Sequence, residues 1–243
     1  MFIHYRTQGI FLKKEDRGEA DQFFTIYTKD FGKLKILGRA IRKIKSKLRS
    51  SSELFYLSEI EFIQGKAYKT LTDAVLIEKF LNIRKDLSKL KVAYQIVDIT
   101  DKLIGKEEKE EKIWDLLTKT FQKLNDCSLP RISCFMAYYY FLWNILSISG
   151  YGVKLDDCVL CRAKLKENIK IYFDPQEGGL ICNNCFKKIQ LGTEINPETI
   201  KILRVLLGGD WKIIAKLKIK KSHLKSLKEI SDSYLSSILD VFK

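Results

Sequence analysis

The chain has 243 residues, of which 46% are hydrophobic and 30% are charged, a balance that argues against a wholly disordered polypeptide. It carries 44 Lys and Arg against 30 Asp and Glu, so its formal net charge is +14. That surplus favours a polyanionic partner such as nucleic acid or an anionic membrane surface, although a Lys- and Ile-rich composition can also reflect the base bias of a genome.

The first segment, residues 1–78, has the pattern of β-strands: apolar and polar residues alternate, and β-branched and aromatic residues are frequent. Gly32 and Gly65 are expected to mark hairpin turns. About five strands in so short a segment predict a small closed or partly open β-barrel, because closure removes exposed edges. Five aromatic residues could stack nucleic-acid bases, but the barrel core is the expected place for most of them: Phe11, Phe23, Phe24, Tyr27 and Phe31.

A run of cations without any acid lies between two of the predicted strands, at 39–49, and reads RAIRKIKSKLR. Such a connection suits a phosphate backbone, since several cations can displace counterions without reading bases. An ordinary solvated hairpin loop is the alternative. Three arginines in eleven residues favour nucleic-acid contact, and the candidate residues are Arg39, Arg42, Lys43, Lys45, Lys47 and Arg49.

From about residue 79 the apolar residues recur at helical spacing, with a solvated charged turn, GKEEKEE, at 105–111. Pro130 precedes an apolar helix at 131–149, and helices return after residue 187, with a break at Gly208 and Gly209. We therefore predict a helical domain made of 79–151 and 187–243, into which a cysteine segment, 152–186, is inserted.

The stretch 132–153 contains no charged residue and is long enough to span a bilayer. It nevertheless carries Asn144, three serines and four tyrosines, which fit a buried bundle helix better than lipid. The N-terminus shows no basic-then-apolar layout of a secretory signal, so we expect a cytoplasmic protein with reduced thiols.

Two Cys-x-x-Cys pairs have the spacing C-x2-C-x20-C-x2-C, and they are formed by Cys158, Cys161, Cys182 and Cys185. This spacing predicts a zinc ribbon with one structural Zn²⁺, in which a short strand and turns at 169–182 lead into the second pair. A redox pair would be expected once, at the start of a helix near a βαβ pattern, and four thiolates leave no open position for catalytic water. Cys127 and Cys134 lie outside the spacing and are predicted to be packing residues.

A second cationic run, 211–228, has seven lysines and no acid. Either a solvated bundle face or an additional surface for DNA or an acidic protein tail would explain it. The chain contains no phosphate-binding loop, dinucleotide fingerprint, metalloprotease motif or nucleophile elbow. His4 and His223 are far apart in sequence, and Asp156 and Asp157 fit a polar turn, so we do not expect an enzyme.

Several stretches in the same order resemble the RecO family of bacterial recombination mediators. They are GEADQFFTIYTKDFGKLKIL and RAIRKIKSKLRSSSELFYLSEIEF in the first segment, then GYGVKLDDCVLC and YFDPQEGGLICNNC around the cysteine pairs. The resemblance covers nearly the whole chain and matches the zinc-bearing members.

This resemblance implies an α+β chain, with an OB-fold DNA-binding domain at 1–78 followed by the helical domain with its inserted four-cysteine zinc segment. It further implies binding of single- and double-stranded DNA, annealing of complementary strands, and loading of RecA onto strands coated by single-stranded-DNA-binding protein in the RecF pathway. The implied partners are RecR, the single-strand-binding protein and RecF, and the implied location is the cytoplasm, at the nucleoid. The contact with the acidic tail of the single-strand-binding protein would use the helical domain, for which 211–228 is a candidate.

The chain departs from the family in the basic loop, where many members have Lys-Gly and this chain has Arg39-Ala40. The cation is kept, but alanine disfavours the positive φ that glycine allows, so we expect a differently shaped loop. Two other functions remain open from sequence: a zinc-ribbon regulatory factor that reads nucleic acid without annealing it, and a protein–protein scaffold whose charge is incidental.

Overall fold

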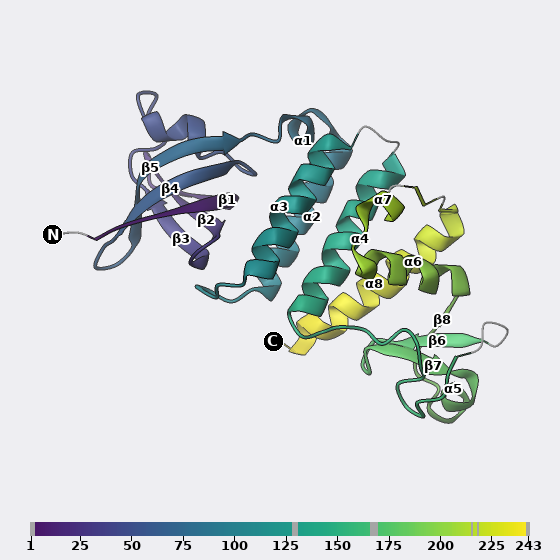
Figure 1. Ribbon diagram of the computed structural model, residues 1–243. Helices are drawn as coiled ribbons and strands as arrows, with labels where there is room; N and C mark the ends of the chain where they lie inside the picture. The colour runs from purple at the N-terminus through teal and green to yellow at the C-terminus, as the bar shows by residue number, and fades with distance from the viewer. Residues whose placement is uncertain (1–2, 128–130, 166–169, 215, 218, 242–243) are drawn as a thin grey trace. The chain divides into compact units, whose positions relative to one another are not determined.

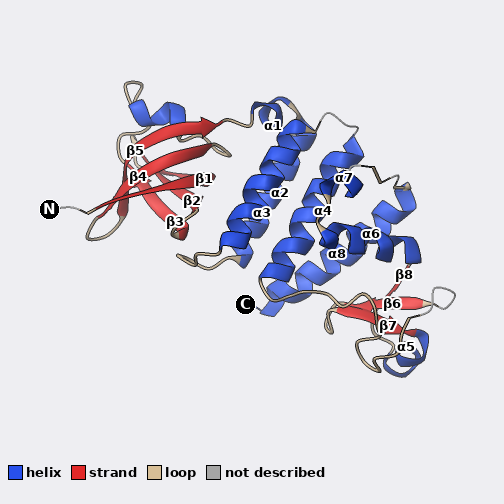
Figure 2. Cartoon of the chain, in the orientation of Figure 1, coloured by secondary structure: helices blue, strands red, loops and turns tan. Residues whose placement is uncertain are grey.

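The computed structural model describes residues 3–127, 131–165, 170–214, 216–217 and 219–241 (Figures 1 and 2). By their internal contacts, the residues form two compact units, Met1–Ser128 and Leu129–Lys243. The helices that directly follow the barrel belong to the same unit as the barrel. The predicted domain boundaries at residues 78, 151 and 187 remain predictions.

The first unit contains the predicted barrel, and the two glycine turns lie where the sequence placed them. Its five strands close in the order β1-β2-β3-β5-β4. The strands are β1 (His4–Arg17), β2 (Asp21–Thr28), β3 (Gly32–Gly38), β4 (Leu57–Gln64) and β5 (Lys69–Glu78). Alternate side chains point inward and fill the barrel, among them the fully buried Phe11, Phe24, Ile26, Ile36 and Ile60.

The barrel closes where β3 pairs with β5 in parallel, through only two residue pairs, Ile36 with Lys69 and Leu37 with Thr70. Because β5 lies between β3 and β4 in the sheet, the chain cannot join β3 to β4 by a tight hairpin. It instead forms a long connection, residues 39–56, that contains the short 3-10 helix η1 (Lys47–Ser51). The basic run lies in this connection.

Three helices complete the first unit: α1 (Leu81–Lys85), α2 (Leu87–Leu103) and α3 (Glu111–Asp126). Asp86 caps α2 by accepting the backbone N–H groups of Ser88 and Lys89. Asp101 of α2 accepts from Lys13 Nζ at 2.6 Å and from Lys33 Nζ at 3.1 Å, which fixes the helix to β1 and β3. Burial opposes ionisation of Asp101, but the two lysines outweigh it and lower the pKa of the carboxyl group.

The charged turn at 105–111 is exposed, as expected, but it is also part of the barrel's surface layer. The backbone N–H of Glu107 donates to the carbonyl of Lys33 at 3.0 Å. The hydroxyl of Tyr27 donates to the carbonyl of Glu110 at 3.3 Å, which buries an aromatic residue on the outer side of β2. A run of charged residues in the sequence does not predict such backbone hydrogen bonds to the barrel.

The second unit is a helical bundle with a small sheet. Its helices are α4 (Arg131–Ile148), α5 (Asn183–Ile189), α6 (Pro197–Gly208), α7 (Trp211–Ile214) and α8 (Lys221–Val241), and its strands are β6 (Ile171–Asp174), β7 (Gly179–Cys182) and β8 (Thr193–Ile195). The apolar helix and the break at Gly208–Gly209 confirm the sequence prediction, and Pro130 lies outside the described residues. The short elements α5 and β8 were not anticipated.

The polar residues of the apolar helix α4 are used inside the bundle. Trp143 Nε1 donates to Ser231 Oγ of α8 at 3.1 Å, and its ring stacks on Tyr234 at 5.5 Å between centroids. Asn144 Nδ2 donates to the carbonyl of Leu206 in α6 at 2.9 Å. Across the described part of the chain, no helix combines the length and apolarity needed to cross a membrane.

The expectation for Ala40 was wrong: the residue adopts φ 51°, the left-handed conformation that glycine favours. Its N–H donates to Asp21 Oδ1 at 2.7 Å, and the N–H of Arg42 donates to the carbonyl of Ala20 at 3.0 Å. These bonds hold the start of the basic connection on the β1–β2 turn and offset a strain of roughly 1–2 kcal/mol. Ala40 itself therefore has a glycine-type backbone conformation.

We predict that Ala40→Gly raises the free energy of unfolding by about 1 kcal/mol, because glycine removes the strain and keeps the N–H donor. The measurement is chemical denaturation of the full chain. Ala67→Gly is the control, since Ala67 is exposed and has no positive φ. An equal loss of stability in both variants would contradict the assignment of strain to Ala40.

Candidate nucleic-acid interface and metal centre

The six cations predicted in the basic run all have exposed side chains. Among the residues that the structure describes, only Arg42 of these six has side-chain partners: Nη1 donates to the carbonyl of Gly18 at 3.2 Å and lies 3.4 Å from a carboxylate oxygen of Asp16. The other five are Arg39, Lys43, Lys45, Lys47 and Arg49. Five uncompensated charges on one connection form a local positive field that a mixed-charge surface lacks.

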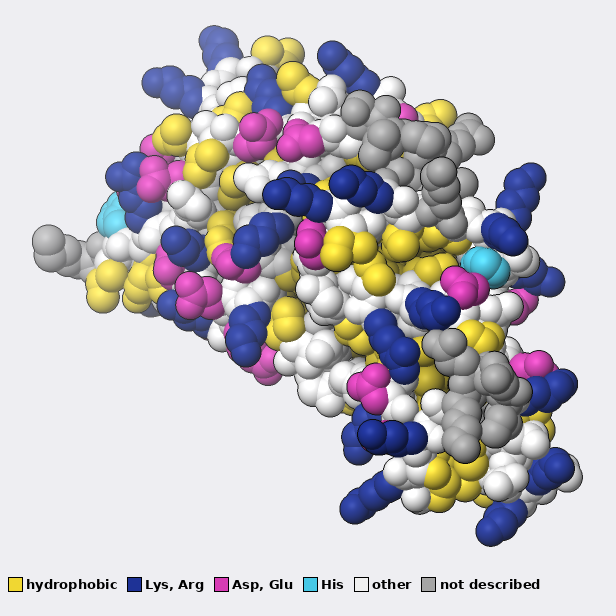
Figure 3. Space-filling view, turned by 45° about the vertical axis from the view of Figure 1, so that its right-hand side comes forward, with side chains coloured by type: hydrophobic (Ala, Val, Ile, Leu, Met, Phe, Trp, Pro, Cys, Tyr) yellow, Lys and Arg dark blue, Asp and Glu magenta, His cyan; other side chains and the backbone are white. Residues whose placement is uncertain are grey.

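Elsewhere on the surface in view, cationic and acidic side chains are mixed. In Figure 3, Lys and Arg side chains are spread over the whole visible face, with Asp and Glu among them. The net charge of +14 is therefore partly a dispersed surplus. The 39–49 run, like the 211–228 run, contains no acid, as the sequence indicated, and it differs from 211–228 in carrying three arginines.

Apolar residues anchor the basic connection to the barrel. Ile41 is 2% exposed and belongs to the barrel core, and Leu48 packs against that core. Ser52 Oγ donates to the carbonyl of Leu48 at 2.6 Å, and Ser58 Oγ donates to the carbonyl of Ser51 at 2.6 Å. The cations are thus carried by a segment whose ends and centre are fixed, which lowers the entropy cost of binding a ligand.

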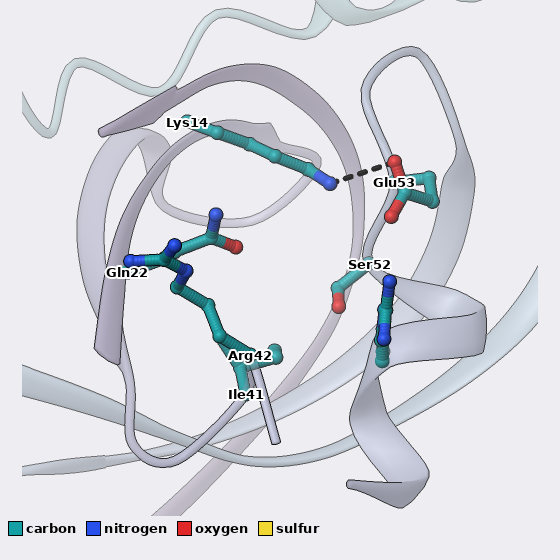
Figure 4. Close-up of a pocket in the computed structure, with 7 residues that line it drawn as sticks. Lys14, Gln22, Ile41, Arg42, Ser52 and Glu53 are labelled. Atoms are coloured by element: carbon teal, nitrogen blue, oxygen red, sulfur yellow. Dashed lines mark ion pairs between the residues drawn. The ribbon is translucent and has the colours of Figure 1, made fainter. Parts of the chain in front are cut away.

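A cavity of about 290 Å³ lies at the root of this connection. Arg42 and Gln22 lie on one side of it, and Ser52 and Glu53 lie on the other (Figure 4). Lys14 Nζ is 2.7 Å from a carboxylate oxygen of Glu53. The cavity is lined by Lys14, Gln22, Ile41, Arg42, Arg49, Ser52 and Glu53. Lys14 is paired with Glu53 and Arg42 with Asp16, so among the described residues Arg49 is the lining cation without an ion pair. Its guanidinium is available at this cavity to an anionic group such as a phosphate.

Sequence reasoning missed four of these lining residues: Lys14, Gln22, Ser52 and Glu53. They come from β1, β2 and the segment before β4, and only barrel closure brings them together. The two arginines were found because a local run of cations is visible in sequence. No local pattern marks the other four.

The aromatic residues of the barrel divide as expected, with most of them in the core. Phe11, Phe24 and Tyr27 are fully buried, and Phe31 packs against the core from the edge. Phe23 and Tyr27 both lie on the outer face of β2, opposite to Phe24. Tyr27 is buried there beneath the 105–111 turn, whereas Phe23 is half-buried.

The four predicted zinc ligands come together in the second unit. The sulfur atoms of Cys158, Cys161, Cys182 and Cys185 all lie within 4.8 Å of one another, and Cys161 Sγ is 3.8 Å from Cys182 Sγ. Four sulfurs at a Zn–S distance of about 2.3 Å are separated by about 3.8 Å in a tetrahedron. The donor set therefore fits a tetrahedral thiolate-bound metal.

Two tight turns position these thiols. In the first turn, the N–H of Arg162 donates to the carbonyl of Cys158 at 2.8 Å, and Arg162 has φ 59°. The second pair begins at the end of β7 and enters α5, where Phe186 stacks on Tyr172 of β6 with centroids 3.6 Å apart. Gly179 lets β7 pass close to the first turn, since a Cβ there would clash with Cγ1 of Val159 and would lie 2.9 Å from the carbonyl oxygen of Lys154. The predicted strand and turn at 171–182 are confirmed.

The thiols differ strongly in acidity. Burial raises the pKa of Cys158, but backbone N–H groups of Cys161, Cys182 and Leu160 outweigh it and lower the pKa to about 6. Burial and the neighbouring thiols of Cys161, Cys182 and Cys158 raise the pKa of Cys185 to about 12. Cys158 is therefore more readily deprotonated than Cys185, and a bound divalent cation would favour the thiolate form of both.

The remaining sequence candidates are outside these two sites. Cys134 is buried in α4, as predicted for a packing residue, and Cys127 is half-buried at the end of α3. The described lysines of 211–228 are exposed, and Ile214 and Leu227 are buried. Ile213, however, is 51% exposed, so the apolar and cationic residues of this run lie on separate faces only in part. Residues 215 and 218 of this run lie outside the described part.

The sequence was compared with known proteins. The family described as Recombination protein O N terminal matches residues 1–80, and Recombination protein O C terminal matches residues 84–241. A DNA repair protein RecO of Dehalococcoides mccartyi (strain CBDB1) is 33% identical over 223 residues, which are 92% of this chain and 86% of that protein. A RecO of Thermoanaerobacter sp. (strain X514) is 27% identical over 97% of this chain and 93% of its own length.

Both family matches follow the order of the structure, with the closed five-stranded barrel under the first and the helices and cysteine cluster under the second. On this evidence the chain belongs to the RecO family of DNA repair and recombination proteins.

Proposed function

We propose that this protein is a recombination mediator that binds single- and double-stranded DNA through the basic connection and anneals complementary strands. The observation that carries the proposal is the fixed connection at 39–49, with five uncompensated cations above a cation-lined cavity. Annealing is opposed by repulsion between two polyanions. A cationic surface that binds both strands weakly lowers this repulsion and needs no nucleotide hydrolysis.

In this proposal the phosphate backbone lies along the exposed cations, and one phosphate enters the cavity between Arg42 and Arg49. The contacts are to phosphates and carry no sequence information, which suits a protein that must act on any strand. The partners would be RecR, the single-stranded-DNA-binding protein and RecF, with RecA loaded as the outcome, and the setting would be the cytoplasm at the nucleoid. The lysines at 211–228 remain the candidate surface for an acidic partner tail.

We further propose one structural Zn²⁺ held by the four clustered thiolates. Its chemistry would be cross-linking: it would join the two turns, whose buried cluster among the described residues is Cys158, Tyr172 and Ile181 with a few half-buried neighbours. The closed set of four sulfur ligands supports a structural ion over a catalytic one.

The first test is reversal of Arg39 and Lys43 to Glu, two cations without side-chain partners among the described residues. We expect roughly tenfold weaker binding of both single strands and duplexes at about 0.1 M salt, and a salt slope reduced by about 0.7–0.9 for each phosphate that the variant no longer neutralises. The measurement is fluorescence anisotropy over a salt series. The matched control, Lys112→Glu with Lys123→Glu, changes the net charge equally on α3, so equal weakening in both variants would refute a localised interface.

The second test is strand annealing without ATP. Two complementary oligonucleotides are coated with the single-strand-binding protein, and duplex formation is followed by energy transfer between end labels. We expect rapid annealing by the natural chain and loss of annealing when all six cations at 39–49 are neutralised. Tight DNA binding without annealing would instead favour a regulatory factor that reads nucleic acid.

The third test concerns the metal. Elemental analysis should find one zinc ion per chain, and Cys158→Ser should lower this to well below one while lowering the thermal midpoint and the solubility. Cys127→Ser, outside the cluster, should keep the ion. We expect the Cys158→Ser protein that stays soluble to retain its DNA affinity. A folded variant that had lost only DNA binding would mean that the metal segment acts in recognition.

A further inference from the structure

We propose that Phe23 and Tyr68, with Arg17 and Lys35 beside them, form a platform on the outer face of the barrel on which unpaired DNA bases stack. This inference rests on the proposed function and deepens it. It assigns to the barrel a preference for single strands that the basic connection by itself cannot provide.

The two rings form an accessible pair on the barrel surface. Phe23 of β2 faces outward and is half-buried, and Tyr68, in the β4–β5 connection, is 44% exposed. Their centroids are 5.1 Å apart with an interplanar angle of 62°. Tyr68 therefore carries most of the exposed ring surface of this pair, and tyrosine is enriched at surfaces that bind a partner.

Two cations lie over these rings. Arg17 Cζ is 5.0 Å from the centroid of Phe23 and 4.6 Å from that of Tyr68, and Lys35 Nζ is 5.0 Å from the centroid of Phe23. Lys35 is also paired with Glu15 at 2.5 Å, whereas Arg17 has no ion pair among the residues that the structure describes. The guanidinium of Arg17 can therefore contact a phosphate or stack on a base while the rings hold its neighbours.

The platform lies next to the root of the basic connection. Phe23 pairs with Leu37 in the β2–β3 ladder, two residues before Arg39. The connection is then tied to the β1–β2 turn by the bonds from Ala40 to Asp21 and from Arg42 to Gly18. A strand whose phosphates follow the cations thus has aromatic faces within reach of its bases.

Other outward positions of this face cannot serve in the same way. Tyr27 is covered by the 105–111 turn, and Lys13 and Lys33 are engaged with Asp101 of α2. The accessible rings are therefore concentrated at the end of the barrel where the basic connection begins. Charge complementarity points to a nucleic acid, and the flat rings point to unpaired bases, because the bases of a duplex already stack on each other.

The test compares single-stranded and duplex DNA of equal length. Phe23→Ala with Tyr68→Ala should weaken single-strand binding about 5- to 30-fold, leave duplex binding unchanged, and leave the salt slope unchanged, since no charge is removed. Phe23→Tyr with Tyr68→Phe should bind as the natural chain does. Tyr94→Ala, at an exposed tyrosine of α2, is the control, and thermal unfolding checks that each variant is folded.

Photo-cross-linking of an oligonucleotide containing 5-iodouracil to the natural chain provides the second readout and needs no variant. We expect cross-links at Phe23 or Tyr68. Cross-links only elsewhere would overturn the proposal, and so would equal weakening of single-strand and duplex binding in the alanine variant.

The failure of the platform can be distinguished from the failure of the proposed function. If the alanine variant binds DNA normally while Arg39→Glu with Lys43→Glu does not, the platform is refuted and the proposed function stands. If the charge reversal leaves DNA binding unchanged, the proposed function is refuted, whatever the effect of the alanine variant.

Discussion

The short parallel pairing of β3 with β5 is the constraint on which the first unit depends. It closes the sheet and removes both edges, and it forces the chain to travel from β3 to β4 by the 39–56 connection. The same closure brings Tyr68, before β5, beside Phe23 of β2. The cations, the cavity at their root and the exposed rings are therefore consequences of one topological choice.

The second unit depends on a different constraint, which is the stabilisation of the two cysteine turns beside its small sheet. Most residues of β6 and β7 are buried, but the cluster around the two cysteine turns consists of Cys158, Tyr172 and Ile181 with half-buried neighbours that include Cys182 and Cys185. A metal ion would supply the cross-link that apolar area does not. The helices of this unit have no such need, since α4 buries large aromatic residues such as Trp143 and Phe141.

Charge and aromatic surface have separate physical roles in the proposed DNA interface. Cations attract the backbone of any nucleic acid and lose strength as salt screens them. Rings interact only with bases that are free of their own stack, and this interaction depends little on salt. A barrel that carries both, side by side, can bind any strand and still distinguish a single strand from a duplex.

Much of this could be predicted from sequence because it depends on local patterns. Alternation predicts the strands, helical spacing predicts the helices, an acid-free run reveals the cations, and the Cys-x-x-Cys spacing names the four thiols. The tertiary structure alone decided which outward residues stay accessible, since Phe23 is only half-buried whereas Tyr27 is fully buried by a distant turn. It also placed Lys14 and Glu53 at the cavity and let Ala40 adopt a positive φ. These features arise from contacts between residues far apart in the chain, where hydrogen bonds such as that from Ala40 to Asp21 override the local preference.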